Sequence, residues 1–169
     1  MDPVAFNILL QSDYPDLIQS CRSSSRFFKI CQLPYFWQEK ARVDFGISKE
    51  AFSAVPGRDN KAAYEYLMKI DPNQGLVDAA RVGSLALVNY FLSRDARDYN
   101  WAMAEAARNG HQEIVNQMIQ RGADNYNLAM ASAARNGHQE IVNQMLQLGD
   151  NDYNMAMALA AGGGHRERK

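Results

Sequence analysis

The sequence predicts an all-α protein in which stacked helical hairpins form a solenoid, because its second half repeats itself. Residues 98–124 and 125–151 are identical at 20 of 27 positions, and residues 152–165 begin another copy. An older copy lies upstream, since residues 78–83 resemble residues 105–110 at the same spacing of 27. A fixed period of about 20–50 residues is typical of stacked supersecondary units. No segment alternates between apolar and polar residues as a strand would.

Within each copy, local signals predict two short helices. Asp98, Asn125 and Asp152 stand at the starts of three copies as N-caps, because their side-chain oxygens accept first-turn amides. Gly110 ends the first helix, since glycine readily adopts the left-handed backbone that closes a helix, and Gly122 ends the second. Each helix carries an apolar stripe that needs a neighbour to cover it: Ala102, Met103, Ala106 and Ala107 in the first, and Ile114, Val115, Met118 and Ile119 in the second.

The repeated residues resemble the ankyrin family. The run AARNGHQEIVNQMIQRGAD (106–124) is similar to the ankyrin consensus, the match extends over 133–149, and it continues loosely over 79–92. The period is shorter than the ankyrin value of about 33, and Trp101 to Ala104 replace the usual Thr-Pro-Leu-His. The junction 122–125 is too short for the family's β-hairpin finger.

The resemblance therefore implies fingerless, ankyrin-like hairpins, of a kind similar to repeats in large DNA viruses. The array is expected over 75–169, as units 75–97, 98–124 and 125–151 and a partial unit 152–169.

Residues 1–37 form a block of short helices with many large apolar side chains. Pro3 begins one helix, a second is expected from Asp16 to Cys31, and Leu33-Pro34 ends it before a third. The order of motifs resembles an F-box, through Asp2-Pro3, Ile8-Leu9-Leu10, Tyr14-Pro15-Asp16-Leu17, Ser25-Arg26-Phe27 and Leu33-Pro34-Tyr35-Phe36-Trp37. Two positions depart from that family, since Asp2 replaces its opening leucine and a serine replaces its cysteine.

The F-box resemblance implies a module at 1–45 that docks on the small adaptor subunit of a cullin-based ubiquitin ligase. The residues that it implicates in docking are Pro3, Leu9, Leu17, Phe27 and Trp37. The alternative is a plain helical bundle that caps the solenoid. Residues 46–74 are expected to form a helical connector, because they lack the Gly/Ser-rich composition of a flexible tether.

Composition excludes several classes of partner. The net charge of −1 provides no field to attract nucleic acid or an anionic membrane. No apolar run approaches the 18 or more residues of a membrane span, and the N-terminus lacks the basic start of a signal peptide. Cys21 and Cys31 are expected to be small buried residues with free thiols, in a reducing compartment. The expected location is the cytoplasm, of a host cell if the source is viral, with the nucleus possible.

The sequence predicts neither a metal site nor a cofactor nor an enzyme. His111, His138 and His165 share one position in different repeats, so stacking would hold them roughly 10 Å apart. Ligands of one zinc ion lie about 2 Å from it. A histidine that hydrogen-bonds the inter-helix turn is the simpler interpretation. No phosphate-binding loop, nucleophile motif or Cys/His cluster is present.

Positions that differ between near-identical repeats indicate where a partner binds. They lie four residues apart on the first helices, and an arginine continues the line. Drift on a solvated surface is the alternative explanation. The predicted partner-binding groove comprises Trp101, Glu105, Arg108, Leu128, Ser132, Arg135, Met155 and Leu159.

Together these features predict an adaptor without chemistry of its own. The F-box-like end would dock on the ligase adaptor subunit, and the repeats would recruit an unknown target protein. Two alternatives remain open: a ligase-independent scaffold that sequesters a partner, and a structural protein that self-associates through its open C-terminal repeat.

Overall fold

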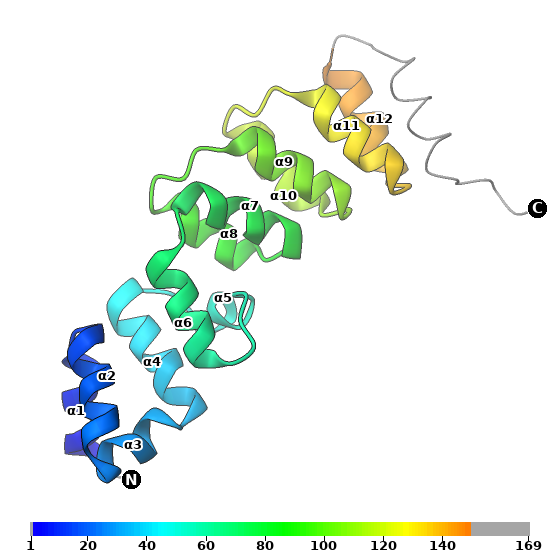
Figure 1. The fold of residues 1–169 in the computed structure, drawn as a ribbon. Coiled ribbons are helices and arrows are strands. Elements are labelled where there is room, and N and C mark those ends of the chain that lie inside the picture. The colour runs from blue at the N-terminus through cyan, green and yellow to red at the C-terminus, as the bar shows by residue number, and fades with distance from the viewer. Residues whose placement is uncertain (1, 150–169) are drawn as a thin grey trace, which may run out of the picture. The chain divides into compact units, whose positions relative to one another are not determined.

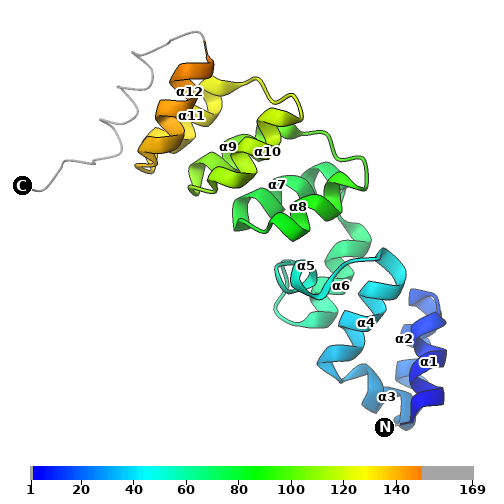
Figure 2. The same ribbon diagram turned by 180° about the vertical axis from the view of Figure 1, so that it is seen from behind.

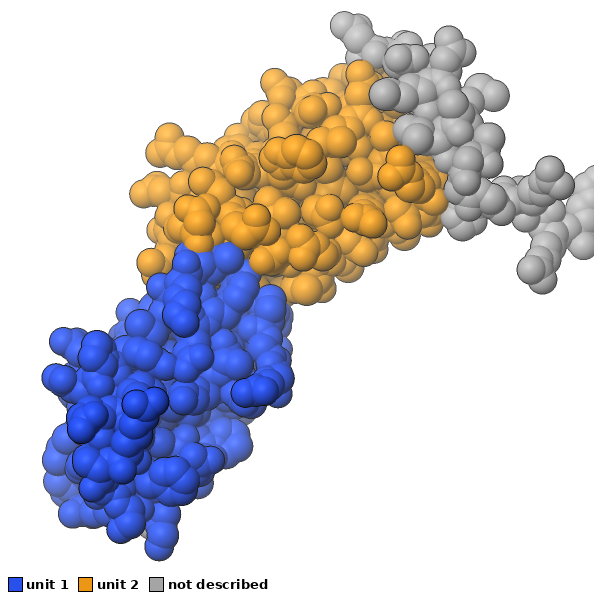
Figure 3. All heavy atoms as spheres, viewed as in Figure 1, with its two compact units in different colours: residues 1–70 blue, residues 71–169 orange. Residues whose placement is uncertain are grey.

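The computed structural model describes residues 2–149, which fold into α-helices joined by short loops and contain no strand (Figure 1). The predicted all-α class is therefore confirmed. The chain divides into two compact units, residues 1–70 and 71–169 (Figure 3). No helix in the described part has the length and hydropathy of a membrane span.

Unit 1 is a bundle of short helices, several of which begin at the residues that the sequence signals predict. Asp2 Oδ1 accepts hydrogen bonds from the amides of Val4 and Ala5, both at 3.1 Å, and so caps the first helix. Ser48 caps the short fifth helix in the same way, at 3.2 Å from the Ala51 amide. The helices are α1 (Pro3–Gln11), α2 (Tyr14–Ser23), α3 (Ser25–Cys31), α4 (Pro34–Phe45), α5 (Lys49–Ser53) and α6 (Asn60–Lys69).

The predicted helix from Asp16 to Cys31 is broken at Ser24. This residue is extended (φ −132°, ψ 124°), and its hydroxyl accepts a hydrogen bond from the Phe27 amide at 3.5 Å, which starts α3. The turn brings Cys21 and Cys31 to a Cα separation of 6.1 Å, within the range of a disulfide, and the two are bonded. The prediction that both are buried is confirmed. The prediction of free thiols is wrong, so the cysteines no longer argue for a reducing compartment.

The core of unit 1 is aromatic and includes the segment that was expected to be a connector. The ring of Trp37 on α4 lies 5.2 Å from Phe36 and 5.4 Å from Tyr64 on α6. Residues 46–70, with α5 and α6, thus belong to unit 1. The boundary between the units falls at Ile70, earlier than the predicted one after residue 74.

A buried cation joins three helices of unit 1. Lys40 is almost fully buried, and its Nζ donates hydrogen bonds to Leu10 O at 3.0 Å and to Asp44 Oδ1 at 2.7 Å. The Tyr64 hydroxyl donates to the other carboxylate oxygen of Asp44 at 2.5 Å. Burial and this hydrogen bond raise the pKa of Tyr64 above its ordinary value.

Unit 2 consists of three described helical hairpins stacked in two rows. The first helices α7 (Pro72–Val82), α9 (Tyr99–Arg108) and α11 (Tyr126–Arg135) lie side by side in one row. The second helices α8 (Leu85–Leu92), α10 (Gln112–Gln120) and α12 (Gln139–Leu148) form the other row (Figures 1 and 2). Gly110 has φ +77° and ends α9 as predicted. No β-hairpin finger occurs between the described repeats, which the short junctions predict.

The predicted N-caps differ in outcome. Asn125 Oδ1 accepts a hydrogen bond from the Leu128 amide at 3.2 Å, which confirms its role. Asp98 lies at the predicted N-cap position of α9, but its side chain does not accept a first-turn amide. Its own amide donates to Asn73 Oδ1 of the preceding repeat, at 3.2 Å. Asp152 lies outside the described residues.

Candidate protein-binding surface

The predicted groove residues lie on one face of the first helices. Positions i, i+4 and i+7 of a helix share a face, so Trp101, Glu105 and Arg108 form a line along α9. We call this surface the first-helix face; its members are Gln74, Asp78 and Arg81 on α7, Trp101, Glu105 and Arg108 on α9, and Leu128, Ser132 and Arg135 on α11. Trp101 is 59% exposed, the second largest exposed fraction among the exposed large apolar side chains of the described residues. Met155 and Leu159 lie outside the described residues.

Ion pairs connect the helices of this face at one end. Arg81 Nε lies 3.2 Å from Glu105 Oε2 on the next helix, and Arg81 NH1 lies 2.9 Å from Asp78 Oδ1. Burial alone would lower the pKa of Arg81, but the hydrogen bond to Glu105 and the neighbouring carboxylates more than offset it and raise that pKa. Arg108 NH1 approaches the other oxygen of Glu105 at 3.6 Å. The Glu105 carboxylate is therefore held between two guanidinium groups.

His111 and His138 hydrogen-bond neighbouring repeats. His111 Nε2 donates to Arg81 O at 3.2 Å, and His138 Nε2 donates to Arg108 O at 3.1 Å. Each ring thus hydrogen-bonds the end of the first helix of the preceding repeat, next to its closing glycine. The hydrogen-bonding interpretation of His111 and His138 is confirmed, and His165 lies outside the described part. No group of three or more potential metal ligands occurs among residues 2–149.

Asparagines on the first helices hold the junctions between repeats. Asn100 Oδ1 accepts hydrogen bonds from the amides of Asp124 and Asn125, both at 2.9 Å. Asn73 Oδ1 does the same one repeat earlier, with the amides of Arg97 at 2.6 Å and Asp98 at 3.2 Å. Sequence reasoning missed this contact, although an asparagine two residues after each N-cap position was its signal.

The second helices are joined by side-chain amides, which sequence reasoning also missed. Gln117 Nε2 donates to Asn89 Oδ1 at 2.7 Å, and Gln144 Nε2 donates to Asn116 Oδ1 at 2.7 Å. Gln144 Oε1 accepts from Gln112 Nε2 at 2.5 Å, whereas Gln117 Oε1 is buried without a partner. Gln117 Oε1 lacks a donor because the residue equivalent to Gln112 in the preceding repeat is Leu85, which has no polar side-chain atom.

The residues that the F-box resemblance assigns to docking are mostly in the core of unit 1. Leu9 and Leu17 are fully buried and Trp37 is 3% exposed, whereas Phe27 is half-buried and Pro3 is exposed. In this conformation Leu9 and Leu17 are therefore closed to direct contact with a partner, and Trp37 is accessible only where it lines a cavity. These three pack the bundle, because each lies on the inward side of its helix.

Other apolar side chains are available on unit 1. Val4 and Ile8 lie one turn apart on the outer side of α1 and are both more than half exposed. A separate cavity of about 120 Å³ is lined by Phe28, Ile18 and Trp37, among others, with half-exposed Phe28 at its edge. At both places unit 1 can bury further apolar surface against a partner.

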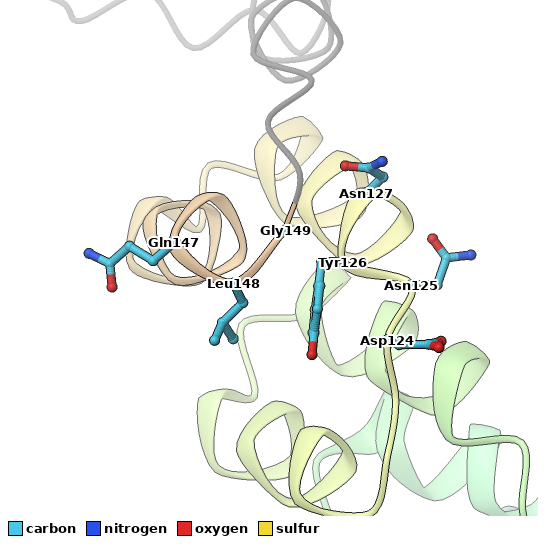
Figure 4. Close-up of a pocket in the computed structure, with 7 residues that line it drawn as sticks. All are labelled: Asp124, Asn125, Tyr126, Asn127, Gln147, Leu148 and Gly149. Carbon is cyan, nitrogen blue, oxygen red and sulfur yellow. The ribbon is translucent and has the colours of Figure 1, made fainter.

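A polar cavity lies between the start of α11 and the end of α12 (Figure 4). Its volume is about 590 Å³, and its lining comes from residues 124–127 and 147–149. Asp124, the one carboxylate of this lining, already accepts a hydrogen bond from Asn100 Nδ2 at 3.0 Å. The cavity therefore presents no pair of groups suited to acid–base or nucleophilic chemistry.

Comparison with known proteins agrees with the repeat geometry. Residues 76–157 match the family model described as ankyrin repeats in three copies. No curated protein and no solved structure matches the chain. Proteins with such repeats are in general non-enzymatic binding scaffolds, so the match supports a role in protein–protein interaction. The described hairpins of residues 76–149 are thus similar to ankyrin repeats.

Proposed function

We propose that this protein is an adaptor that holds a target protein on the first-helix face of unit 2 and docks on a second protein through unit 1. The second protein is the small adaptor subunit of a cullin-type ubiquitin ligase. The observation that carries the proposal is Trp101, a large aromatic side chain that stands exposed on the same face as Arg108. Tryptophan and arginine dominate the binding energy of protein interfaces.

The pattern of sequence change supports binding on the first-helix face. Between the two most similar repeats, Trp101 becomes leucine and Glu105 becomes serine, and both positions belong to that face. The buried residues Ala102, Met103 and Ala106 are retained in the next copy. Packing explains the retained positions, and selection for a particular partner explains change at the exposed ones.

Unit 1 offers apolar surface that suits docking on a second protein. Ile8 is 53% exposed with Val4 beside it, and Phe28 is 54% exposed at the edge of the cavity that reaches Trp37. An apolar side chain of the partner that enters this cavity would contact Trp37 from outside. This revises the docking assignment from the buried residues to their exposed neighbours.

The adaptor acts by bridging. Holding both proteins at once raises the effective concentration of the target near the ligase, to the millimolar range for short connections. This function requires the cytoplasm or the nucleus, where thiols are usually reduced. The test therefore uses both the reduced and the oxidised form of the Cys21–Cys31 pair.

The experiment is co-expression with the ligase adaptor subunit followed by gel filtration, with and without reductant. The variants are Ile8→Asp and Phe28→Asp, and the matched control is Met68→Asp, an exposed apolar residue on α6. We expect a stoichiometric complex that the control retains and that at least one of the two variants loses. Elution of the wild-type protein alone in both conditions would refute ligase docking and favour the ligase-independent scaffold.

A further inference from the structure

The ion pairs of the first-helix face contain a template for a carboxylate site. Glu105 lies between Arg81 of the preceding helix, at 3.2 Å, and Arg108 of its own helix, at 3.6 Å. Its side chain is only 20% exposed, so the site holds the carboxylate partly out of solvent. Arg81, Glu105 and Arg108 thus show how two arginines on this face bind a carboxylate.

One repeat later, the same arrangement lacks its acid. Arg108 and Arg135 occupy the positions of Arg81 and Arg108, and the position of Glu105 is taken by Ser132. Arg108 and Arg135 are both exposed, and Arg135 makes no ion pair with another described residue. The next residue of this series, Leu159, lies outside the described part and carries no carboxylate.

Among the described residues of the first-helix face, charge is unbalanced only on α11. On α7, Asp78 balances Arg81, and on α9, Glu105 balances Arg108. On α11, Ser132 is neutral, so no described residue of the face compensates Arg135. The face therefore offers two guanidinium groups around an unfilled carboxylate position, next to the exposed Trp101.

We propose that an acidic side chain of the partner protein fills this position, between Arg108 and Arg135, while an adjacent apolar side chain packs on Trp101 and Leu128. This inference rests on the proposed function of the first-helix face. Leu128 precedes Ser132 by one helical turn, about 5–6 Å. Two residues of an extended peptide span about 6.6 Å, so the partner segment carries an acidic and an apolar residue two positions apart.

A substitution within the chain tests whether the position accepts a carboxylate. Ser132→Glu supplies the missing acid, and we expect it to raise the unfolding midpoint temperature by about 1–4 °C. In the Arg135→Gln background, Ser132→Glu should raise the unfolding midpoint temperature by a smaller amount, because one of the two guanidinium groups is absent. If Ser132→Glu lowers the unfolding midpoint temperature both in the wild-type protein and in the Arg135→Gln variant, the proposed geometry is overturned.

Selection of peptides tests the chemistry of the partner. A phage-displayed library of 12-residue random peptides is selected on the wild-type protein, and the affinity of enriched peptides is measured by fluorescence polarisation. We expect peptides with an acidic and an apolar residue two positions apart. Ser132→Glu and Arg135→Glu should each weaken them at least tenfold. Gln120→Glu, which adds one negative charge on α10 as Ser132→Glu does on α11, should leave the affinity unchanged.

The outcomes separate this inference from the proposed function. Peptides that lose affinity with Trp101→Ala but contain no acidic residue and tolerate Ser132→Glu would overturn the inference and leave the face as a binding site. If no peptide is enriched, or if the enriched peptides are insensitive to Trp101→Ala, both the inference and the binding role of the face are refuted.

Discussion

Gly110 is the position where one methyl group tests how neighbouring repeats are joined. It closes α9 with φ +77°, and a Cβ atom placed on it would lie 2.7 Å from Cε1 and 2.8 Å from Nδ1 of His138. The same histidine donates its hydrogen bond to Arg108 O at 3.1 Å. Gly110→Ala therefore strains the backbone and also displaces the ring that joins the second described repeat to the third.

The two effects can be estimated separately. The left-handed conformation costs a residue with a Cβ atom about 1–2 kcal/mol. Displacing His138 loses a hydrogen bond with a net contribution of about 0.5–1.5 kcal/mol. We expect Gly110→Ala to lower the free energy of unfolding by about 2–3 kcal/mol in the wild-type protein. In a His138→Ala background only the backbone cost remains, which is about 1–2 kcal/mol.

The assay is a double-mutant cycle measured by urea unfolding with far-UV circular dichroism. We expect a coupling energy of about 1 kcal/mol between Gly110→Ala and His138→Ala. Gly46→Ala serves as a control for the backbone cost alone, because Gly46 has φ +67° and no atom within 4 Å of its Cβ position. Gly46 belongs to unit 1, and the fluorescence of buried Trp37 reports the unfolding of that unit. An equal loss of stability in both backgrounds would refute the role of the histidine contact.

Three further substitutions follow from the same structure. Asp95 has φ +63° at the repeat position of Gly122, so Asp95→Gly should raise the free energy of unfolding by about 0.5–1 kcal/mol, measured by urea titration. Leu85→Gln should supply the donor that Gln117 Oε1 lacks and raise that free energy by about 1 kcal/mol. The raised pKa of Tyr64 means that its contribution is full below the unfolded-state pKa of about 10 and falls as the pH rises above it. Tyr64→Phe should lessen this alkaline loss, measured by unfolding at pH 8–11.

Each of these predictions has a defined contrary result. A lower urea midpoint for Asp95→Gly would mean that the aspartate makes a stabilising contact that outweighs its backbone conformation. Leu85→Ala controls for lost apolar contact, and Leu85→Gln must be more stable than Leu85→Ala if the new hydrogen bond forms. An alkaline loss of equal size in wild type and Tyr64→Phe would assign that loss to other tyrosines.

The periodic part of the fold could be predicted because its signals are local and repeated. Gly110 marks the end of a helix by its own backbone freedom, and Asn125 caps the helix that follows it. The buried positions Met103 and Ile114 follow from the apolar stripe within each helix. Because two successive repeats have nearly the same sequence, most positions of the repeat are observed twice. A single ambiguous residue therefore cannot displace the predicted helix boundaries.

Contacts between distant elements could not be predicted from one sequence. Lys40 appears in the sequence as an ordinary helical lysine, and only the approach of α1 places Leu10 O within reach of its Nζ atom. The disulfide between Cys21 and Cys31 depends on the break at Ser24, which a single serine in a run of three does not specify. The burial of Leu9, Leu17 and Trp37, which the F-box resemblance assigns to docking, could not be predicted for a related reason. Large apolar residues such as Trp37 identify both cores and interfaces, and only the packed structure separates the two.

The polar contacts between repeats explain how these ankyrin-like repeats stack without fingers. The first-helix core is made largely of alanine and methionine, which are small or flexible and fix the register of neighbouring helices only weakly. Directional hydrogen bonds provide that register at three places on each repeat: the junction held by Asn100, the helix end held by His138, and the amide pair of Asn116 and Gln144. Each contributes about 0.5–1.5 kcal/mol, and none uses a side chain of the first-helix face, since His138 bonds only the backbone carbonyl of Arg108. Side chains on that face can therefore change with the partner while these hydrogen bonds are preserved.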